Sequence, residues 1–178
     1  MELWDLYTVE RERTGRTMVR GDKIPEDFYH LVVHVCIFNS KGEMLIQQRQ
    51  PFKEGWPNMW DITVGGSAVS GDTSRTAAAR ELFEELGIEL SFEDKRPSLT
   101  VHFPSGFDDM YLVEKDVDLS ELKLQYEEVQ SASWRSEEGI LDMIDAGEFI
   151  PYKKSLIKLL FAMRDSMGGF MREDTKLR

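Results

Sequence analysis

The sequence predicts an α+β sandwich, and three observations support this fold class. Several short segments are rich in β-branched and aromatic residues and are bounded by turn residues, as strands are. Between them lies a run rich in alanine and glutamate, a composition that favours a helix. Two further amphipathic segments follow the last of the strand-like segments, so helices are both interspersed with the strands and placed at the end.

The strands are assigned in chain order from their composition and from turn signals. Residues 3–8 predict a short first strand, and the polar segment 10–27 predicts loop and turn before the core. LVVHVCIF (31–38) ends at the turn NSKG, so EMLIQQR (43–49) is expected to return as the second arm of a hairpin. The remaining strand segments are 59–64, which runs into a glycine loop, a second hairpin formed by 98–103 and 109–115, and a final strand at 129–134.

Helices are predicted in the middle of the chain and at its end. The first helix begins after Thr73, a residue type that caps helix N-termini, and ends before Gly87, a typical C-terminal cap. The other two cover about 137–146 and about 152–166. The last helix carries an apolar stripe that we expect to pack in the core or against a second copy of the chain, made by Leu156, Ile157, Leu159, Leu160 and Met163.

Length and composition indicate one domain over residues 1–178, with an N-terminal strand and loop (1–28), a core (29–135) and C-terminal helices (136–178). We expect a cytoplasmic protein. The first residues lack an apolar stretch with a cleavage site, and Cys36 alone can form no internal disulfide. No apolar run approaches the roughly 20 residues that span a bilayer. The net charge of −11 argues against a nucleic acid polymer as partner, because such binding relies on many Lys and Arg contacts.

The segment GGSAVSGDTSRTAAARELFEELGI joins a glycine loop to the first helix and concentrates acidic residues. At ~100° per residue, Glu81, Glu84 and Glu85 share one arc of this helix, and Arg80 lies one turn before Glu84 and can pair with it. The opposite arc is apolar and consists of Ala78, Ala79, Leu82, Phe83 and Leu86. A solvated acidic face would give the same pattern. Clustered carboxylates repel each other, however, and a hard divalent cation such as Mg²⁺ would remove that repulsion.

This segment resembles the Nudix signature, which runs Gly, five residues, Glu, seven residues, then Arg-Glu-apolar-x-Glu-Glu-x-Gly-apolar. The chain has Gly66, five residues, Asp72, seven residues and then RELFEELGI, which begins at Arg80. The pattern covers 23 residues and departs from the family only at Asp72, where the family has Glu. The resemblance implies a single Nudix domain, a Nudix-type α/β/α sandwich with a mixed sheet.

The resemblance also implies a metal-dependent hydrolase that cleaves a diphosphate linkage in a nucleoside diphosphate derivative or a related small diphosphate. In the family, the carboxylates that match Glu81, Glu84 and Glu85 hold one or more Mg²⁺ or Mn²⁺ ions, and a Glu activates the attacking water. The family resemblance and the apolar stripe of the last helix together suggest a homodimer.

Further roles follow from positions in the signature. We expect Arg80, Glu81 and Glu84 to be catalytic and Asp72 to support them. The glycines of the loop, Gly65 and Gly66, are expected to lie against the substrate. The general base stays open, because Glu81 can serve and because in many members of the family the base lies outside the signature, where the candidates are Asp108, Asp109, Glu127 and Glu128.

The region before the signature resembles the branch of the superfamily that includes isopentenyl-diphosphate isomerase. In that enzyme the residues that match Arg49 and Lys53 bind the substrate diphosphate, and the residue that matches His30 is a metal ligand. The isomerase needs a catalytic Cys and a metal-binding His before the helix, where this chain has Gly65 and Ser67. A hydrolase is therefore favoured, and the alternatives are an isomerase-like enzyme and a non-catalytic nucleotide-binding regulator. A regulator predicts a damaged carboxylate set, and this set is intact.

Overall fold

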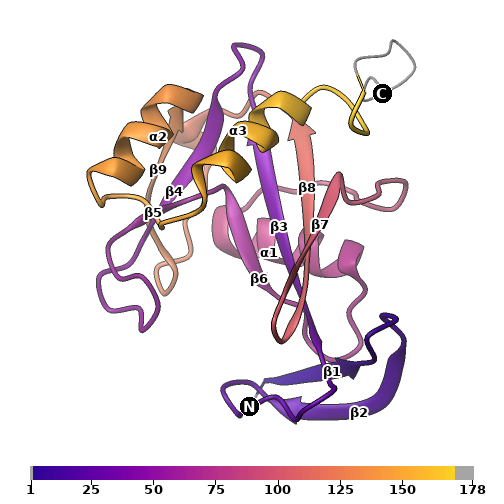
Figure 1. The fold of residues 1–178 in the computed structure, drawn as a ribbon. Coiled ribbons are helices and arrows are strands. Elements are labelled where there is room, and N and C mark those ends of the chain that lie inside the picture. Colours follow the sequence, from indigo (N-terminus) through magenta and orange to yellow (C-terminus); the bar gives the residue numbers. More distant parts are fainter. Residues whose placement is uncertain (1, 171–178) are drawn as a thin grey trace.

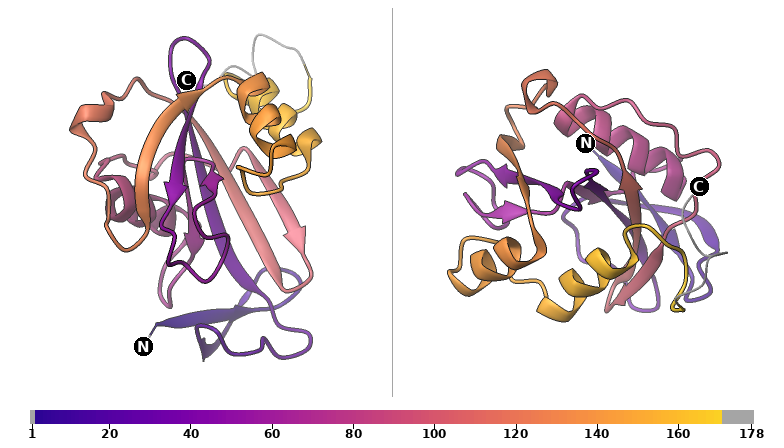
Figure 2. Two further views of the ribbon diagram at one scale, coloured as in Figure 1. Left: turned by 90° about the vertical axis from the view of Figure 1, so that its left-hand side faces the viewer. Right: turned by 90° about the horizontal axis from the view of Figure 1, so that it is seen from above.

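A mixed sheet lies between two layers of helices in the computed structural model, which describes residues 2–170 (Figure 1). The elements in chain order are β1 (Leu3–Tyr7), β2 (Arg13–Val19), β3 (His30–Phe38), β4 (Met44–Arg49), β5 (Trp60–Asp61), β6 (Val64–Ser67), α1 (Ser74–Leu86), β7 (Leu99–Phe103), β8 (Gly106–Glu114), the 3₁₀ helix η1 (Leu119–Glu121), β9 (Val129–Arg135), α2 (Glu137–Asp145) and α3 (Lys154–Met163). Helix α1 covers one face of the sheet, and α2 and α3 cover the other (Figure 2). This arrangement confirms the predicted α+β sandwich. Residues 171–178, the end of the predicted C-terminal helical segment, lie outside the described residues.

Strand β3 organises the sheet because it has different partners along its length. It runs parallel to β8 from His30↔Gly106 to Phe38↔Glu114, which makes the sheet mixed. On its other side it pairs antiparallel with β6 over Val32–Val35 but meets β4 only at Phe38↔Met44. Strands β4 and β6 therefore leave β3 at different heights, and the sheet forks between them. Strand β4 continues the outer arm of this fork by pairing with β9 and β5.

The alternation of side chains along β3 supplies both halves of the core. Val33 and Val35 face α1 and pack against its apolar side, where Leu82 and Leu86 are fully buried. Burying each of these side chains contributes about 1.5–3 kcal/mol. On the opposite face, Cys36 and Phe38 pack with buried residues of α2 and α3. The apolar stripe of α3 packs in the core through Ile157 and Leu160, but Leu159 is 43% exposed, so the expectation is wrong for that residue. Within residues 2–170 no helix is long and apolar enough to cross a membrane.

Strand β2 occupies part of the segment 10–27, which the sequence predicts as loop and turn. It pairs antiparallel with β1 from Leu3↔Val19 to Tyr7↔Arg13, and the two strands form a separate hairpin below the main sheet (Figure 1). Most residues of β2 are exposed, so the strand lacks the apolar alternation from which strands are recognised. The prediction of loop was wrong because β2 pairs with β1 alone among the described strands, so its sequence does not need to bury a face.

The segment 59–64, predicted as one strand, divides into β5 and β6 because Thr63 uses its side chain where a ladder would continue. Thr63 Oγ1 accepts a hydrogen bond from the backbone nitrogen of Ile37 at 2.9 Å and donates one to the carbonyl oxygen of Leu45. One buried hydroxyl group therefore joins β3 to β4 at the fork. Because Thr63 lies between β3 and β4, the strand before it, β5, pairs with β4, and the strand after it, β6, pairs with β3.

The hairpin of β7 and β8 is confirmed, although β8 begins at Gly106 and not at residue 109. The predicted turn between β3 and β4 is present, but these strands share a single register pair and do not form an extended hairpin. Helix α3 is shorter than the predicted 152–166. Tyr152 lies outside it because its hydroxyl group donates a hydrogen bond to Asp61.

His30 opens β3 and packs against the N-terminal hairpin. Its ring stacks on Trp4 with a centroid separation of 4.4 Å and an interplanar angle of 14°, and it meets Phe103 edge to face with a centroid separation of 5.4 Å. The side chain is buried, and Nδ1 has no hydrogen-bond partner among the described residues. Burial lowers the pKa of His30 from 6.5 to about 4.

We expect His30 to make stability depend on pH. In mild acid the unfolded chain binds a proton at this residue while the folded protein, with its lowered pKa, does not. The contribution of His30 to stability is complete above pH 6.5 and is lost as the pH falls toward about 4. The free energy of unfolding, measured with urea, should be lower at pH 5 than at pH 7. This decrease should be smaller by about 2 kcal/mol in His30→Gln than in the wild type. His102→Gln, which changes an exposed imidazole, should follow the wild type, and an equal loss in all three proteins would contradict this expectation.

Candidate active site

Helix α1 has the predicted bounds because a threonine side chain caps its N-terminus and a glycine caps its C-terminus. Thr73 accepts a hydrogen bond from the backbone nitrogen of Thr76 at 3.2 Å, and Thr76 Oγ1 accepts one from the nitrogen of Thr73 at 2.8 Å. Gly87 ends the helix in the left-handed conformation with φ 70°. These caps set where α1 begins and ends, and the packing of Leu82 and Leu86 against β3 sets which side of the helix faces the sheet.

The three glutamates of the signature reach different places. Glu81 lies against Gly66 of β6, since a Cβ at Gly66 would lie 2.3 Å from the carboxyl carbon of Glu81. Glu85 is only 5% exposed and accepts a hydrogen bond from Nε2 of Gln47 in β4 at 2.9 Å. Glu84 points outward with a side chain 47% exposed. Helix α1 therefore spans the fork, with Glu81 on one arm and Glu85 on the other.

The predicted apolar arc is right for Ala78, Leu82 and Leu86, which are buried. It is wrong for Phe83, which is 53% exposed. Glu85, which the pattern placed on the acidic arc, is buried on the sheet side, where its partner Gln47 is a polar residue of β4 that faces the helix.

Arg80 connects the glutamates to the loop before the helix. Its Nη1 donates to Glu81 Oε1 at 2.9 Å and to Glu84 Oε2 at 3.0 Å, which confirms the predicted pairing with Glu84. Its Nε and Nη2 donate to Asp72 Oδ2 at 3.1 and 3.0 Å, and Nη2 also donates to the carbonyl oxygen of Ser67. Burial opposes the charge, but Glu81 and Asp72 raise the pKa of Arg80 above its ordinary value. The shorter side chain of Asp72 thus still reaches the guanidinium group.

The carboxyl groups that face the sheet carry unbalanced charge. Burial, together with Glu81 and Glu128, raises the pKa of Glu85 well above its usual range. Burial also raises the pKa of Glu81, although Arg80 acts in the opposite direction. Beside Glu85, the Oε1 atom of Gln47 is buried and has no hydrogen-bond partner among the described residues. A cation at this point would stabilise both carboxylates and use the free amide oxygen.

The predicted single patch of three carboxylates is not preassembled. Within residues 2–170, no group of three or more His, Cys, Asp and Glu side chains is arranged to hold a metal ion. Arg80 binds Glu81 and Glu84, and Glu85 turns toward Gln47. The donor set still fits a hard divalent cation, because carboxylate oxygens and an unpartnered amide oxygen are the ligands that such ions prefer.

The predicted phosphate-binding cations lie on the outer arm of the fork. Nε of Arg49 donates to the carbonyl oxygen of Gly55 at 3.0 Å, and its Nη1 lies 3.9 Å from Asp61. Arg49 also lowers the pKa of Glu85, so its charge acts on the glutamate site. Nζ of Lys53 donates to Oε1 of Glu128 at 2.6 Å. Lys53 is therefore neutralised by a carboxylate, whereas the guanidinium group of Arg49 makes one short hydrogen bond to the residues that the structure describes.

The four alternative bases differ in their surroundings. Asp109 is buried and accepts hydrogen bonds from Arg11 at 2.7 Å and from Thr100 at 2.6 Å, so both of its oxygens are used. Its neighbour Asp108 points to the opposite face of β8. Glu127 is exposed on the loop after η1, next to Glu128, which pairs with the lysine described above.

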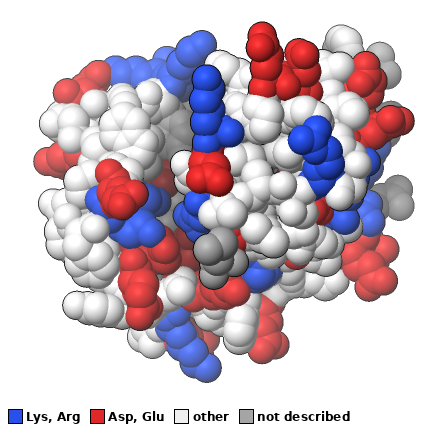
Figure 3. Space-filling view, turned by 90° about the horizontal axis from the view of Figure 1, so that it is seen from below, with Lys and Arg blue, Asp and Glu red and all other residues white. Residues whose placement is uncertain are grey.

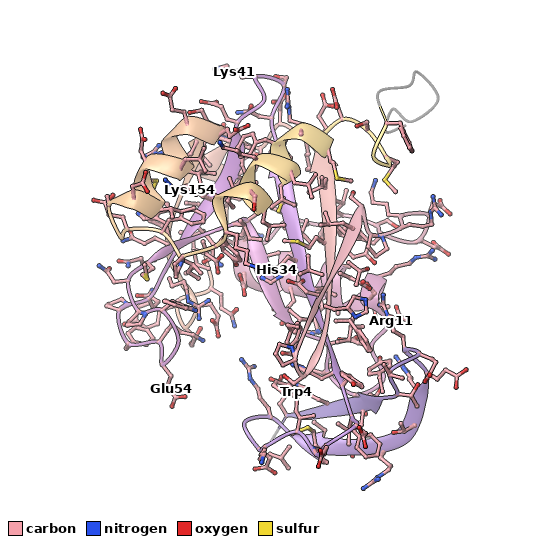
Figure 4. The ribbon with its side chains drawn as sticks, viewed as in Figure 1. Trp4, Arg11, His34, Lys41, Glu54 and Lys154 are labelled. Atoms are coloured by element: carbon pink, nitrogen blue, oxygen red, sulfur yellow. The ribbon has the colours of Figure 1, made fainter. Side chains whose placement is uncertain are left out.

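A second polar cluster lies on the other side of β6 around His34, which Figure 4 labels, and it includes Asp108, one of the four alternative bases. A Cβ at Gly65 would lie 2.1 Å from Cδ2 of His34, so this glycine makes room for the imidazole ring. Nδ1 of His34 lies 2.7 Å from Asp108, and the hydroxyl group of Tyr152 donates to Asp61 at 2.8 Å. Burial opposes protonation, but Asp108 and Asp61 raise the pKa of His34. The signal in the sequence for this cluster was His34 itself, a polar residue at an inward-facing position of the otherwise apolar strand 31–38.

Aromatic residues near the fork are only partly available to a ligand. Trp56, in the loop between β4 and β5, is half exposed and has a positive φ of 51°. Figure 4 shows Glu54 at the tip of this loop, which projects away from the sheet. Trp60 lies in β5 beside Gln48 and is half-buried against the α2 and α3 side of the core. Of these two indoles, Trp56 is the more exposed.

Comparisons with known proteins identify the class. The NUDIX domain family matches residues 28–155. An uncharacterized Nudix hydrolase of Listeria monocytogenes is 51% identical over 152 residues, which cover 85% of this chain and 90% of the relative. The crystal structure of DR0079 from Deinococcus radiodurans is similar with a TM-score of 0.71 and 29% identity, over 89% of this chain and 97% of that one. The isopentenyl-diphosphate Delta-isomerase of Citrobacter koseri is 27% identical over 155 residues, 81% of each chain.

The chain therefore belongs to the Nudix family, and it is a Nudix hydrolase. Hydrolases of this family act on small diphosphate compounds and generally use divalent metal ions. The weaker similarity to isopentenyl-diphosphate isomerases agrees with the resemblance of the region before the signature. The roles of individual side chains stay predictions, and the homodimer does as well.

We predict that Gly66→Ala lowers activity because the new methyl group would collide with the carboxyl group of Glu81. Displacing Glu81 by about 1 Å should reduce the hydrolysis rate at least ~10-fold. Gly169→Ala is the matched control, since a Cβ there would have nothing within 4 Å and its φ is not positive. The rates of both variants are compared with wild type on the diphosphate compound that it hydrolyses. Equal rates in all three proteins would show that Gly66 does not set the position of Glu81.

Proposed function

We propose that this protein is a metal-dependent hydrolase, using Mg²⁺ or Mn²⁺, of a nucleoside diphosphate derivative or a related small diphosphate. The observation that carries the proposal is the pair of sheltered carboxyl groups on α1, Glu81 and Glu85, beside the unpartnered amide oxygen of Gln47. Burial makes this pair unfavourable when it is ionised and alone, as their raised pKa values indicate. A divalent cation that bridges to a diphosphate would balance the charge.

Glu81, Glu84 and Glu85 are the residues that would hold the ion, with Gln47 as a further oxygen donor. When bound, the ion would neutralise the phosphate oxygens and favour attack by water at phosphorus. Glu84 is the exposed member, so it can turn from Arg80 toward the ion without a rearrangement of the helix. Glu85 is already fixed by the amide group of Gln47.

Glu81 is our assignment for the group that accepts the proton of the attacking water. Burial raises its pKa, which makes its carboxylate a stronger base than an exposed glutamate. Arg80 holds one of its oxygens at 2.9 Å and leaves the other for the water. Asp72 supports this arrangement by fixing the opposite edge of the guanidinium group. Gly66 allows the carboxyl group to lie directly on the backbone of β6.

Arg49 is our assignment for the cation that binds the diphosphate. Its guanidinium group is planar and suited to two phosphate oxygens, and among residues 2–170 most of its donors are not used by short hydrogen bonds. Lys53 contributes less, because a phosphate would have to displace Glu128.

The isomerase alternative is disfavoured by the packing around the loop. A cysteine at position 65 would collide with the ring of His34, because a Cβ there has no room. Cys36 cannot replace it, since burial raises the pKa of its thiol and keeps it protonated. The regulator alternative is disfavoured by the complete set of carboxylates on α1.

We predict that Glu84→Gln and Glu85→Gln each lower kcat/KM by about 10- to 100-fold, the usual effect of weakening a metal site. Chelation of divalent ions should abolish turnover, and Mg²⁺ or Mn²⁺ should restore it. Product release from a panel of nucleoside diphosphate derivatives and prenyl diphosphates measures this, with circular dichroism to check the fold. Glu93→Gln, an exposed glutamate beyond the helix, is the control. Unchanged turnover in the first two variants would refute the site.

We also predict a difference between the two cations of the outer arm. Arg49→Gln should raise KM about 10-fold with a smaller change in kcat, because it removes a contact made in the ground state as well as in the transition state. Lys53→Gln should change KM by less than about threefold, since Lys53 is already paired. Steady-state kinetics on one substrate measures both variants. A larger effect of Lys53 than of Arg49 would reverse the assignment.

A further inference from the structure

The N-terminal hairpin lies outside residues 28–155, the part of the chain that matches the Nudix domain, yet it contacts the loop that leads into α1. Seen from below, the face that includes this hairpin carries acidic and basic side chains side by side and no large patch of one sign (Figure 3). Its role is therefore to be sought in the contacts that it makes with the body of the protein.

Asp5 of β1 binds the turn at the end of the glycine loop. Its Oδ1 accepts a hydrogen bond from Ser70 Oγ at 2.7 Å, and its Oδ2 accepts one from the backbone nitrogen of Gly71 at 3.0 Å. The backbone nitrogen of Ser70 donates to the carbonyl oxygen of Leu3 at 2.7 Å. The side chain of Asp5 is 16% exposed, so these bonds are largely sheltered from water. Three hydrogen bonds thus join two residues of β1 to two consecutive residues of the loop.

The conformation of this turn depends on the same residues. The backbone nitrogen of Asp72 donates to the carbonyl oxygen of Val69 at 2.9 Å, which closes a β-turn with Gly71 at its third position. Gly71 has φ 94°, a value that only glycine adopts at little cost. Apart from Asp5, no hydrogen-bond partner for the Gly71 amide group is present among the described residues. The carboxylate of Asp5 therefore fixes a flexible position.

Arg13 of β2 adds a second connection between the hairpin and the turn. Its Nη2 donates to the carbonyl oxygen of Asp72, and its Nε lies 3.6 Å from Asp5 Oδ2. The backbone of Asp72 is thus held from the hairpin while its side chain binds Arg80. Arg80 in turn binds Glu81 and Glu84. The contacts form a continuous path from β1 to the two glutamates.

We propose that Asp5 is a positioning residue for the active site, acting through Asp72 and Arg80 on Glu81 and Glu84. This inference rests on the function proposed above. Asp5 touches neither substrate nor metal; it restricts the turn so that Asp72 presents its carboxylate to Arg80. A Nudix hydrolase with this N-terminal hairpin therefore depends for full activity on a residue outside the domain that carries its signature.

The test compares Asp5→Ala with Asp5→Asn. Alanine removes both acceptor oxygens, so the turn no longer holds Arg80 and Glu81 in position. We therefore expect kcat to fall about 10-fold while KM changes by less than about twofold. Asparagine can still accept from Gly71 and donate to Ser70 Oγ, so it should keep kcat within about threefold of wild type. Asp22→Ala removes an exposed acid from the same N-terminal region and should leave kcat unchanged. All assays are done at a temperature at which circular dichroism shows each variant folded.

Two further measurements do not depend on turnover. The dissociation constant for Mn²⁺, measured by calorimetry without substrate, should rise several-fold in Asp5→Ala and remain near wild type in Asp5→Asn. Hydrogen exchange should become faster for the amide groups of residues 70–72 in Asp5→Ala. If Asp5→Ala does not fold, Ser70→Ala removes one of the two side-chain bonds and should weaken Mn²⁺ binding to a smaller extent.

The outcomes separate this inference from the proposed function. If wild type hydrolyses nothing in the panel, the proposed function fails, whereas the Mn²⁺ and exchange measurements still test the effect of Asp5. If a folded Asp5→Ala protein keeps the kcat and the Mn²⁺ affinity of wild type, the hairpin only stabilises the fold and the inference is overturned. The same conclusion follows if Asp5→Asn loses as much activity as Asp5→Ala.

Discussion

The arrangement of the site depends on the hydrogen bonds that the guanidinium group of Arg80 donates. It is always charged, and its five donors can serve several acceptors at once. Here they join Asp72 in the loop, the carbonyl oxygen of Ser67 in β6, and both Glu81 and Glu84 in α1. Arg80 therefore connects the loop, the strand and the helix to one another. Arg80 also offsets part of the charge of its two glutamates, whereas burial raises the pKa of Glu85, which Arg80 does not touch, well above its usual range.

The fork in the sheet explains why the site forms where it does. Because β4 and β6 separate from β3 at different heights, one helix can contact both arms through residues one turn apart. The adjacent glycines of β6 serve opposite faces of the strand. Gly66 leaves room for Glu81 on the side of α1, and Gly65 leaves room for His34 on the other side. Their lack of side chains is thus explained by packing, independently of any contact with substrate.

Local patterns in the sequence predicted much of the fold and part of the site. The caps of α1, the hairpin of β7 and β8 and the pairing of Arg80 with Glu84 follow from short-range spacing. The contact of Gln47 with Glu85 joins residues 38 apart in sequence and depends on the register of the sheet, so no local pattern could reveal it. Strand β2 was missed because its partner, and not its composition, makes it a strand.

The central claim is that the glutamates of α1 form a site for a divalent cation that binds a diphosphate. The most direct measurement is a crystal structure of the protein with Mn²⁺ and a non-hydrolysable diphosphate analogue, with anomalous scattering recorded to locate the metal. We expect an anomalous peak within bonding distance of Glu81 and Glu85, with Glu84 turned away from Arg80 toward it. A peak elsewhere, or a bound analogue with no metal beside these side chains, would contradict it.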